Sequence, residues 1–333
     1  MTASMTSRRA ALIGAGGALL PLAVPRSLRA QGGAWPSRPL RVVIPFPPGA
    51  STDAVGRTTA AVIGARIGQP VVPENRAGAG GNIGAEAVAK SDPDGHTLLI
   101  ATISATTMGP HLYPRLPYDP MRDLVPVART CHTPNCIAAR ADLPAATLRE
   151  ALDLARARPG QLTYGSPGNG TSGHLIAESL NHRLGVSMQH VPYRGTAPMI
   201  TDLIAGRLDL VHDNLPAYLP QARDGKLKIL AVTSEARWYS APEIPTVAEA
   251  AGLPGFAAMI WWGVQVPTGT PAPIVERLSG ILLEGFGTAE VRERLRGYSI
   301  EPAPLDSAGF ARFVEAEHRR WGEVVRTANI RLD

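Results

Sequence analysis

The chain carries, at residues 41–53, the segment Arg41-Val-Val-Ile-Pro-Phe-Pro-Pro-Gly-Ala-Ser-Thr-Asp53. An apolar, β-type run leads there into a Gly/Pro loop with hydroxyl side chains, and a helix-like stretch follows. The same order recurs in Leu162-Thr-Tyr-Gly-Ser-Pro-Gly-Asn-Gly-Thr-Ser-Gly-His174, before a second helix-like stretch. A helix N-terminus has unpaired N–H groups and a partial positive charge, so each junction suits an anion. Two such loops that face each other would hold both ends of a small carboxylate.

Outward from these junctions, strand-like and helix-like segments alternate from Trp35 to the end of the chain. This alternation predicts an α/β fold with parallel-rich sheets and helices on both faces. Ligands of such sheets bind beyond the carboxyl ends of the strands, where both Gly-rich loops lie. The expected strands are 40–46, 71–73, 97–102, 124–129, 162–164, 188–191, 208–211, 228–233 and 260–266. The expected helices are 55–67, one that runs through 89, 148–158, one from 175, 197–205, one from 271 and one from about 308.

The first 30 residues are typical of an export signal. Arg8-Arg9 precede the apolar stretch Ala10–Leu20, and Ser27-Leu28-Arg29-Ala30 supplies a small-residue cleavage site. The paired arginines resemble a twin-arginine signal; a disordered basic N-terminus is the alternative. No later run approaches the roughly 18 apolar residues of a membrane span. We therefore expect a soluble mature protein in the periplasm.

Removal of this segment changes the charge of the chain. The whole sequence has 33 Lys and Arg, 28 Asp and Glu, and a net charge of +5. Four arginines and no acidic residue lie in the first 30 positions, so the mature chain has 29 basic and 28 acidic residues. Its net charge is then +1. A nucleic-acid partner loses its main support.

The two cysteines, Cys131 and Cys136, lie in Cys-His-Thr-Pro-Asn-Cys. An oxidising compartment favours a small local disulfide between them, and free thiols are the alternative. A metal site would need further ligands at defined spacing, and His132 alone gives it little support. We expect no metal and no cofactor.

Several stretches together resemble the Bug family, the extracytoplasmic solute-binding proteins of tripartite tricarboxylate transport systems. The resemblance covers about residues 35–330. It is carried by Trp35-Pro-Ser-Arg-Pro-Leu-Arg-Val-Val-Ile-Pro-Phe46, Glu74-Asn-Arg-Ala-Gly-Ala-Gly-Gly-Asn-Ile-Gly84, Tyr164-Gly-Ser-Pro-Gly-Asn-Gly-Thr171, His190-Val-Pro-Tyr-Arg-Gly195, Leu230-Ala-Val-Thr-Ser234 and Ile244-Pro-Thr-Val-Ala-Glu249.

The resemblance implies a two-domain periplasmic-binding-protein fold, similar to type II, with a ligand cleft between the domains. One domain would comprise residues 35–131 plus 253–333, and the other residues 132–252. The protein would capture a di- or tricarboxylate, an acidic amino acid or an aromatic acid. It would deliver the solute to a tripartite tricarboxylate transporter permease, or report it to a sensor kinase ectodomain. A monomer without enzymatic activity suits this role.

The ligand-binding residues are expected in three groups. Residues of the first loop would donate hydrogen bonds to the carboxylate, and those of the second loop would form the opposing clamp. The alternatives are helix capping for the hydroxyls, a structural role for Asp53 and a solvated surface position for Arg194. The first loop has Ala50 where the family often has a second Gly, and its methyl would restrict φ > 0 or narrow the pocket. The candidates are Gly49, Ala50, Ser51, Thr52 and Asp53; Ser166, Asn169, Gly170, Thr171 and His174; and Thr102, Ser104, Arg194 and Asp213.

Two other classes of function remain open. An exported hydrolase would use a Ser nucleophile with His, but neither Ser166 nor Ser172 lies in a Gly-x-Ser-x-Gly elbow. A phosphate-binding or sensory protein on the same fold would use the same backbone N–H groups.

Overall fold

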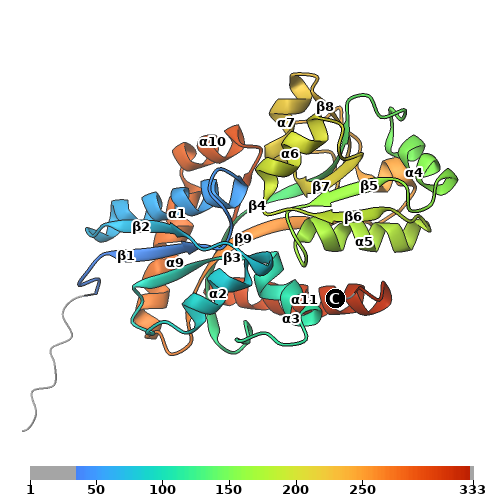
Figure 1. Ribbon diagram of the computed structural model, residues 1–333. Coiled ribbons are helices and arrows are strands. Elements are labelled where there is room, and N and C mark those ends of the chain that lie inside the picture. Colours follow the sequence, from blue (N-terminus) through green and yellow to red (C-terminus); the bar gives the residue numbers. More distant parts are fainter. Residues whose placement is uncertain (1–34, 331–333) are drawn as a thin grey trace, which may run out of the picture. The chain divides into compact units, whose positions relative to one another are not determined.

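The computed structural model describes residues 35–330, and the predicted export signal lies outside them. Residues from Pro36 onward form one compact unit. Its strands pair in the order β2-β1-β3-β9-β4-β7-β5-β6, and β8 and β10 also pair with β4 (Figure 1). The pairing divides the unit into two lobes, each with its own group of parallel strands.

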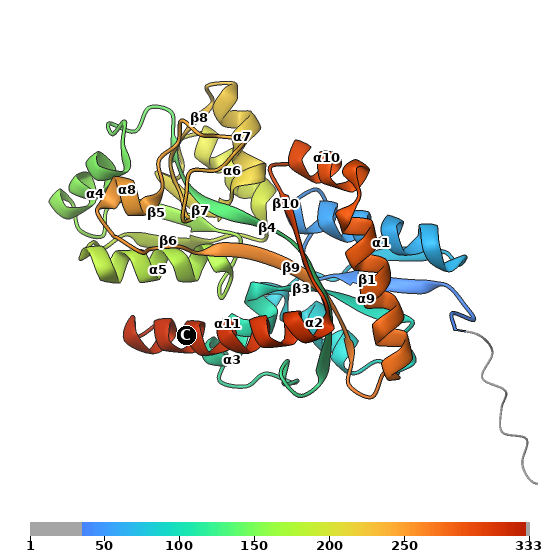
Figure 2. The ribbon, with the colours of Figure 1, turned by 180° about the vertical axis from the view of Figure 1, so that it is seen from behind.

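The first lobe is built on three parallel strands, β1 (Leu40–Ile44), β2 (Val71–Asn75) and β3 (Thr97–Thr102). Strand β9 (Met259–Pro267) runs antiparallel to β3, and β10 (Glu301–Leu305) pairs antiparallel with β4. Helix α1 packs on α9, and α2 contacts β1, β3 and β9, whereas α11 lies along β4 (Figures 1 and 2). The helices are α1 (Ser51–Ile67), α2 (Asn82–Ala89), α3 (Gly109–Leu112), α9 (Ala272–Gly287), α10 (Ala289–Gly297) and α11 (Ser307–Thr327).

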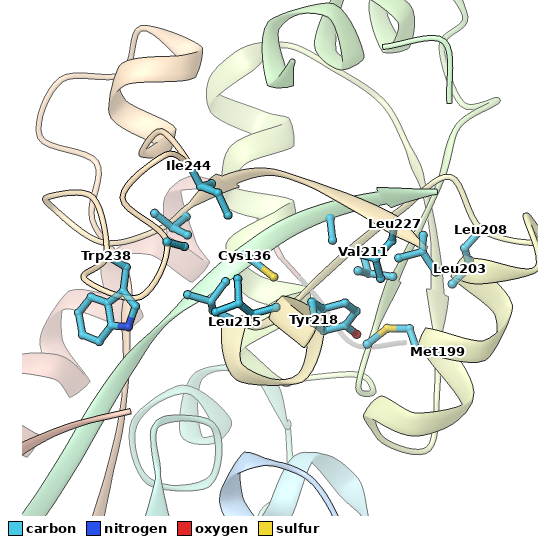
Figure 3. Close-up of a cluster of buried hydrophobic side chains, with 14 residues drawn as sticks. Cys136, Met199, Leu203, Leu208, Val211, Leu215, Tyr218, Leu227, Trp238 and Ile244 are labelled. Atoms are coloured by element: carbon cyan, nitrogen blue, oxygen red, sulfur yellow. The ribbon is translucent and has the colours of Figure 1, made fainter. Parts of the chain in front are cut away.

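The second lobe repeats this plan with β5 (Thr163–Ser166), β6 (Gln189–Pro192) and β7 (Leu210–Asn214), all parallel. Helix α5 covers one face of these strands, and α6 and α7 cover the other (Figure 1). Tyr218, Met199 and Cys136 belong to the apolar cluster between α6, α7 and the sheet (Figure 3). The remaining elements are α4 (Leu148–Ala157), α5 (Ser172–Leu184), α6 (Thr196–Ile204), α7 (Leu215–Arg223), β8 (Leu227–Val232) and α8 (Val247–Ala251).

Strand β4 (Leu124–Arg140) belongs to both lobes. Its first part pairs with β9 as far as Pro134, which lies opposite Met259. From Asn135 onward it pairs with β7 and β8. The sequence predicted only residues 124–129 of this strand, because a proline and several polar residues follow. Two of those polar residues are hydrogen-bonded at the crossing between the lobes: the Thr130 hydroxyl donates to Trp262 O at 3.2 Å, and the Thr133 hydroxyl donates to Ser299 O at 2.8 Å.

The predicted disulfide is wrong, because Cys131 and Cys136 are both free and buried. Both lie on β4, where an extended strand rises about 3.3 Å per residue, so five residues separate them by about 16 Å. Their odd spacing also directs the side chains to opposite faces of the strand. A disulfide needs Cα atoms within about 7 Å, so this strand cannot close one.

Candidate functional site

A cavity of about 270 Å³ lies between the two lobes, beyond the carboxyl ends of their parallel strands. Segments that follow β1, β3, β5, β6 and β7 all contribute to its wall. Eight of the predicted site residues line it: Gly49, Ala50, Thr52, Thr102, Ser104, Thr171, Arg194 and Asp213. The structure thus gathers residues that lie up to 164 positions apart in the sequence.

The N-terminus of α1 forms one side of the cavity. Ala50 is its N-cap residue, and no side chain caps the helix there. The first N–H groups of the helix therefore lack partners inside it and are available to a ligand. Ala50 has φ −102°, an extended conformation that any residue adopts, so its methyl causes no backbone strain. The expected restriction of φ > 0 by the Ala50 methyl group therefore does not apply in this structure.

Asp53 has a structural role in this loop and does not line the cavity. Its carboxylate accepts hydrogen bonds from Gly49 N at 3.1 Å, Arg57 Nε at 2.9 Å and Asn75 Nδ2 at 3.0 Å. Burial raises the pKa of Asp53, but these hydrogen bonds and the Arg57 charge outweigh burial and hold it below its ordinary value. The ionised side chain therefore fixes the loop that presents Ala50 and Thr52. Ser51 is buried beside it and also lies outside the cavity wall.

The opposite side of the cavity is the start of α5. Its N-cap residue Thr171 directs its hydroxyl to Gly168 O at 2.7 Å and does not cap the helix. The N–H of Ser172 donates to Ser104 Oγ at 3.1 Å. Ser104 follows β3 in the other lobe and begins a π-helical turn at Ser104–Met108. A hydrogen bond therefore joins the two lobes across the cavity.

The other predicted residues of the second loop form hydrogen bonds that hold the loop or line a neighbouring cavity. The Ser166 hydroxyl lies 2.7 Å from His190 Nε2 and donates to Gly168 O, and His174 Nδ1 accepts from Gly170 N at 3.3 Å. Asn169 lines a second cavity of about 520 Å³, and Tyr113 OH of the first lobe donates to Asn169 O at 3.1 Å. The four predicted residues Ser166, Asn169, Gly170 and His174 therefore belong to contacts that hold the loop in place, and none of them lines the first cavity.

Asp213 stands on the wall contributed by the second lobe, between the starts of α6 and α7. It is 2% exposed, and its Oδ2 accepts from Thr196 Oγ1 at 2.7 Å and Tyr218 OH at 3.3 Å. Burial raises the pKa of Asp213 to about 6, against hydrogen bonds from Thr196, Asn214 and Tyr218 that lower it. At pH 8 the group is therefore a buried carboxylate whose partners are all neutral.

Arg194 supplies the positive charge at the cavity. It is exposed and lines both cavities, and no ion pair with another residue of the described chain involves it. Arg194 and Asp213 are the charged side chains in the wall of the first cavity. A free guanidinium beside two uncapped helix N-termini favours a carboxylate ligand.

Sequence reasoning missed the apolar part of the wall. Trp262 lines the cavity, and its Nε1 donates to Thr52 Oγ1 at 3.0 Å, so its ring both shapes the cavity and orients a candidate ligand donor. Trp261, its neighbour, turns away and donates to Glu317 Oε2 at 3.3 Å. Apolar wall residues carry no sequence signal that separates them from core. They are Phe46, Pro47, Pro48, Ile103, Pro167, Ala197, Pro198, Ile200, Ala217, Ile260 and Trp262.

Within residues 35–330, no group of three or more His, Cys, Asp or Glu side chains is placed to hold a metal ion. No helix in the same range is both long enough and apolar enough to cross a membrane.

Comparison with known proteins gives a consistent result. A family model described as the tripartite tricarboxylate transporter family receptor matches residues 55–330. A relative from Pseudomonas sp., the UPF0065 protein in the tcbD-tcbE intergenic region, is 40% identical over 300 residues, which are 90% of this chain and 89% of the relative. Protein BugT of Bordetella pertussis is 36% identical over 299 residues, or 90% and 91% of the two chains.

Solved structures agree with this result. The structure of Rpa4515 from R. palustris with adipate has a TM-score of 0.86 and 38% identity, covering 90% of this chain and 100% of that one. The structure of MatC from Rhodopseudomonas palustris with bound malate has a TM-score of 0.81 and 33% identity, and the match covers 87% of this chain and 99% of MatC. The structure of the periplasmic binding protein BugD has a TM-score of 0.83 and 32% identity, and the match covers 90% of this chain and 100% of BugD. The predicted two-domain α/β fold and the resemblance to the Bug family are confirmed.

Proposed function

Because this chain belongs to the tripartite tricarboxylate transporter receptor family, we propose that it captures a small carboxylate in the cavity between its lobes. One observation carries the proposal. The N-termini of α1 and α5, from opposite lobes, both lack side-chain caps and both border the cavity that Arg194 lines. The Ser172 N–H at the start of α5 already donates to Ser104 Oγ, so the other first-turn N–H groups of the two helices and the free guanidinium are the donors for a carboxylate.

Ligand capture proceeds by closure of the lobes. A ligand that contacts both helix N-termini interacts with two lobes at once, so it binds the closed form more tightly than the open form. The Ser172 N–H to Ser104 Oγ bond and the Tyr113 OH to Asn169 O bond join the lobes directly. A ligand that contacts both lobes would add its own contacts to these bonds and so stabilise the closed form further.

The proposal includes the two domains expected from the sequence, 35–131 plus 253–333 and 132–252. The change of partners along β4, from β9 at Pro134 to β7 at Asn135, supports a boundary in this strand. Strand β9 supports the return of the chain to the first lobe after residue 252, because it pairs with β3 and with the first part of β4. Bending within these two strands would move one lobe relative to the other.

The wider role follows from the family. We propose that residues 1–30 export the chain to the periplasm and that a monomer delivers its solute to a tripartite tricarboxylate transporter permease. A sensor kinase ectodomain is the alternative partner. No chemical step is proposed, since the Ser166 hydroxyl is fully buried, bonds to Gly168 O and His190 Nε2, and does not line the cavity.

A thermal-shift screen tests carboxylate capture directly. The mature protein is refolded to remove bound solute and then mixed with carboxylates, inorganic phosphate and sugars. A ligand present at one hundred times its Kd adds about 2.7 kcal/mol to the free energy of unfolding, which raises Tm by several degrees. We expect a response confined to carboxylates. Arg194→Gln should weaken that response, whereas a protein that responds only to phosphate or sugar would contradict the proposed function.

A further inference from the structure

Asp213 places a negative charge in a cavity that is proposed to hold an anion. Asp53, the acidic residue at the start of α1, is balanced by Arg57 at 2.9 Å. Asp213 has no such cation, since the groups bonded to it are the hydroxyls of Thr196 and Tyr218 and the backbone of Asn214. A buried, uncompensated carboxylate is costly, so its place in the cavity wall needs a reason.

The position of Asp213 divides the cavity by charge. Thr196 is the first residue of α6, and Asn214 is the N-cap residue of α7, so both helix N-termini in this wall already face a carboxylate of the protein. The ends of α1 and α5 have no acidic side chain in the cavity. A ligand carboxylate is therefore favoured beside the N-termini of α1 and α5 and opposed beside Asp213.

The groups beside Asp213 add further acceptors. Asn214 also lines the cavity, and its Oδ1 is buried without a hydrogen-bond partner among the described residues. Asn135, opposite Asn214 in the β4–β7 pairing, does not line the cavity, and its Oδ1 and Nδ2 are both unpartnered within residues 35–330, so the acceptor in the cavity wall is Asn214 Oδ1. Unsatisfied buried acceptors mark a place where a donor is missing.

We propose that the ligand carries, besides its carboxylate, a hydrogen-bond donor that meets Asp213, either an ammonium or a hydroxyl group. Asp213 is then the residue that selects this donor and disfavours a second carboxylate at the same place. The inference rests on the proposed function, because it places the carboxylate of the ligand at α1 and α5. It narrows the ligand class to hydroxy acids and amino acids.

Ligands that differ in one terminal group provide the test. For each of the four-, five- and six-carbon chains, the unsubstituted monocarboxylate is compared with its ω-hydroxy, ω-amino and ω-carboxy forms; the six-carbon set is hexanoate, 6-hydroxyhexanoate, 6-aminohexanoate and adipate. Calorimetry at pH 8 keeps Asp213 ionised. We expect a donor-bearing form to bind about tenfold more tightly than the dicarboxylate of its length.

The variant Asp213→Asn distinguishes an ammonium donor from a hydroxyl donor and preserves the shape of the side chain. If the natural donor is an ammonium group, the variant should bind the ω-amino acid about tenfold more weakly, because a charge-assisted bond is lost. If the donor is a hydroxyl group, the ω-hydroxy acid should change little. In both cases the dicarboxylate should bind more tightly than it does to the wild type.

Arg194→Gln is the control, because it should weaken the binding of every ligand without changing the ranking of their affinities. A wild type that binds the dicarboxylate at least as tightly as both donor-bearing forms at every length overturns the inference, and this result does not depend on the folding of a variant. In that case the proposed function still stands, since a carboxylate is bound. If no carboxylate binds at all, the proposed function fails first.

Discussion

At the scale of single residues, Asp53 and Asp213 show how environment assigns different roles to the same side chain. Asp53 lies in the first turn of α1, after β1, and Asp213 lies at the end of β7, just before α7. Asp53 accepts hydrogen bonds from a cation, an amide and a backbone N–H, which lower its pKa despite burial. Asp213 is more deeply buried among neutral groups, and burial raises its pKa to about 6. The first side chain stabilises a loop, and the second is held at a cost beside the cavity.

This cost should appear in the pH dependence of stability. The pKa of Asp213 rises from 3.8 to about 6 on folding, so the native state binds its proton more tightly than the unfolded state. The penalty is absent below pH 3.8, grows as the pH rises to 6, and is then complete at about 3 kcal/mol. Asp213→Asn carries no such penalty. Its free energy of unfolding should therefore rise relative to the wild type between pH 4 and pH 8.

Urea denaturation of both proteins at pH 4, 6 and 8 measures this difference. Asp92→Asn is a suitable control, because that carboxyl is exposed at the surface, forms no ion pair within residues 35–330 and does not line the cavity. A constant difference between Asp213→Asn and wild type across this range would show that Asp213 titrates normally in the folded protein.

At the scale of elements, His174 of α5 stacks on His190 of β6, and Tyr164 of β5 packs between His190 and His212 of β7. The rings of His174 and His190 lie 4.1 Å apart, and Tyr164 contacts both His190 and His212. Burial lowers the pKa of His174 to about 4 and the pKa of His212 to about 3. Burial and the neighbouring histidines also lower the pKa of His190 to about 3. This cluster supports the loop that carries Thr171 at the cavity.

The cluster predicts acid lability. Each histidine has a lower pKa folded than unfolded, so its full contribution to stability is present above about pH 6.5. That contribution is lost as the pH falls from there toward 4, because the unfolded state binds protons that the native state excludes. His212 has no hydrogen-bond partner for either ring nitrogen among the described residues, so His212→Phe removes a titrating group without breaking a bond.

We expect Tm of the wild type to fall more steeply than that of His212→Phe between pH 6.5 and 4. His182→Phe is the control, since His182 lies in the last turn of α5, away from the cluster. Parallel Tm curves for wild type and His212→Phe would mean that His212 does not contribute to acid lability.

The sequence predicted most elements, but not all, for identifiable reasons. Strands β1 and β3 and helix α1 have long apolar runs and clear end signals, and their expected positions are confirmed to within a few residues. Helices α7 and α10 and strand β10 were missed, because prolines interrupt α7 and β10 and charged residues dominate α10. The antiparallel pairing of β4 and β9 is set by contacts between distant parts of the chain, which local patterns do not reveal.

The cavity likewise contains residues that local sequence patterns reveal and residues that depend on contacts between distant parts of the chain. The hydroxyl residues Thr52, Thr102 and Ser104 lie at or beyond the carboxyl ends of β1 and β3, and they were predicted because topology brings the carboxyl ends of parallel strands together. Trp262 and Tyr113 were not, since their contribution depends on how the two lobes meet. Ser166 and His174 were also predicted as ligand contacts; they lie outside the wall of the first cavity and hydrogen-bond to His190 Nε2 and Gly170 N.

At the scale of the whole molecule, closure depends on a close approach at Gly170. A Cβ atom there would lie 2.9 Å from the hydroxyl of Tyr113 in the other lobe. Gly170→Val should therefore hold the lobes apart and weaken ligand binding by about tenfold or more, without contact between the new side chain and the ligand. Gly206→Val is a matched control, because Gly206 has the same φ of +72° with open space around it.

Calorimetric titration with the best carboxylate compares these variants. Both should lose similar stability, because valine is strained at this φ. Only Gly170→Val should lose affinity, and the added change Tyr113→Ala should restore part of it. Equal affinities for the two variants would exclude closure at Gly170 as a requirement for binding.

Strand β4, which both lobes share, also has a consequence for the order of folding. Its first half pairs with residues 259–267, more than one hundred positions later in the chain. During synthesis the second lobe is complete while the first still lacks β9, β10 and the long helix α11. The edge of β4 stays unpaired until then, and unpaired edges invite association with other chains. Such a chain gains from chaperone protection before its last quarter is made.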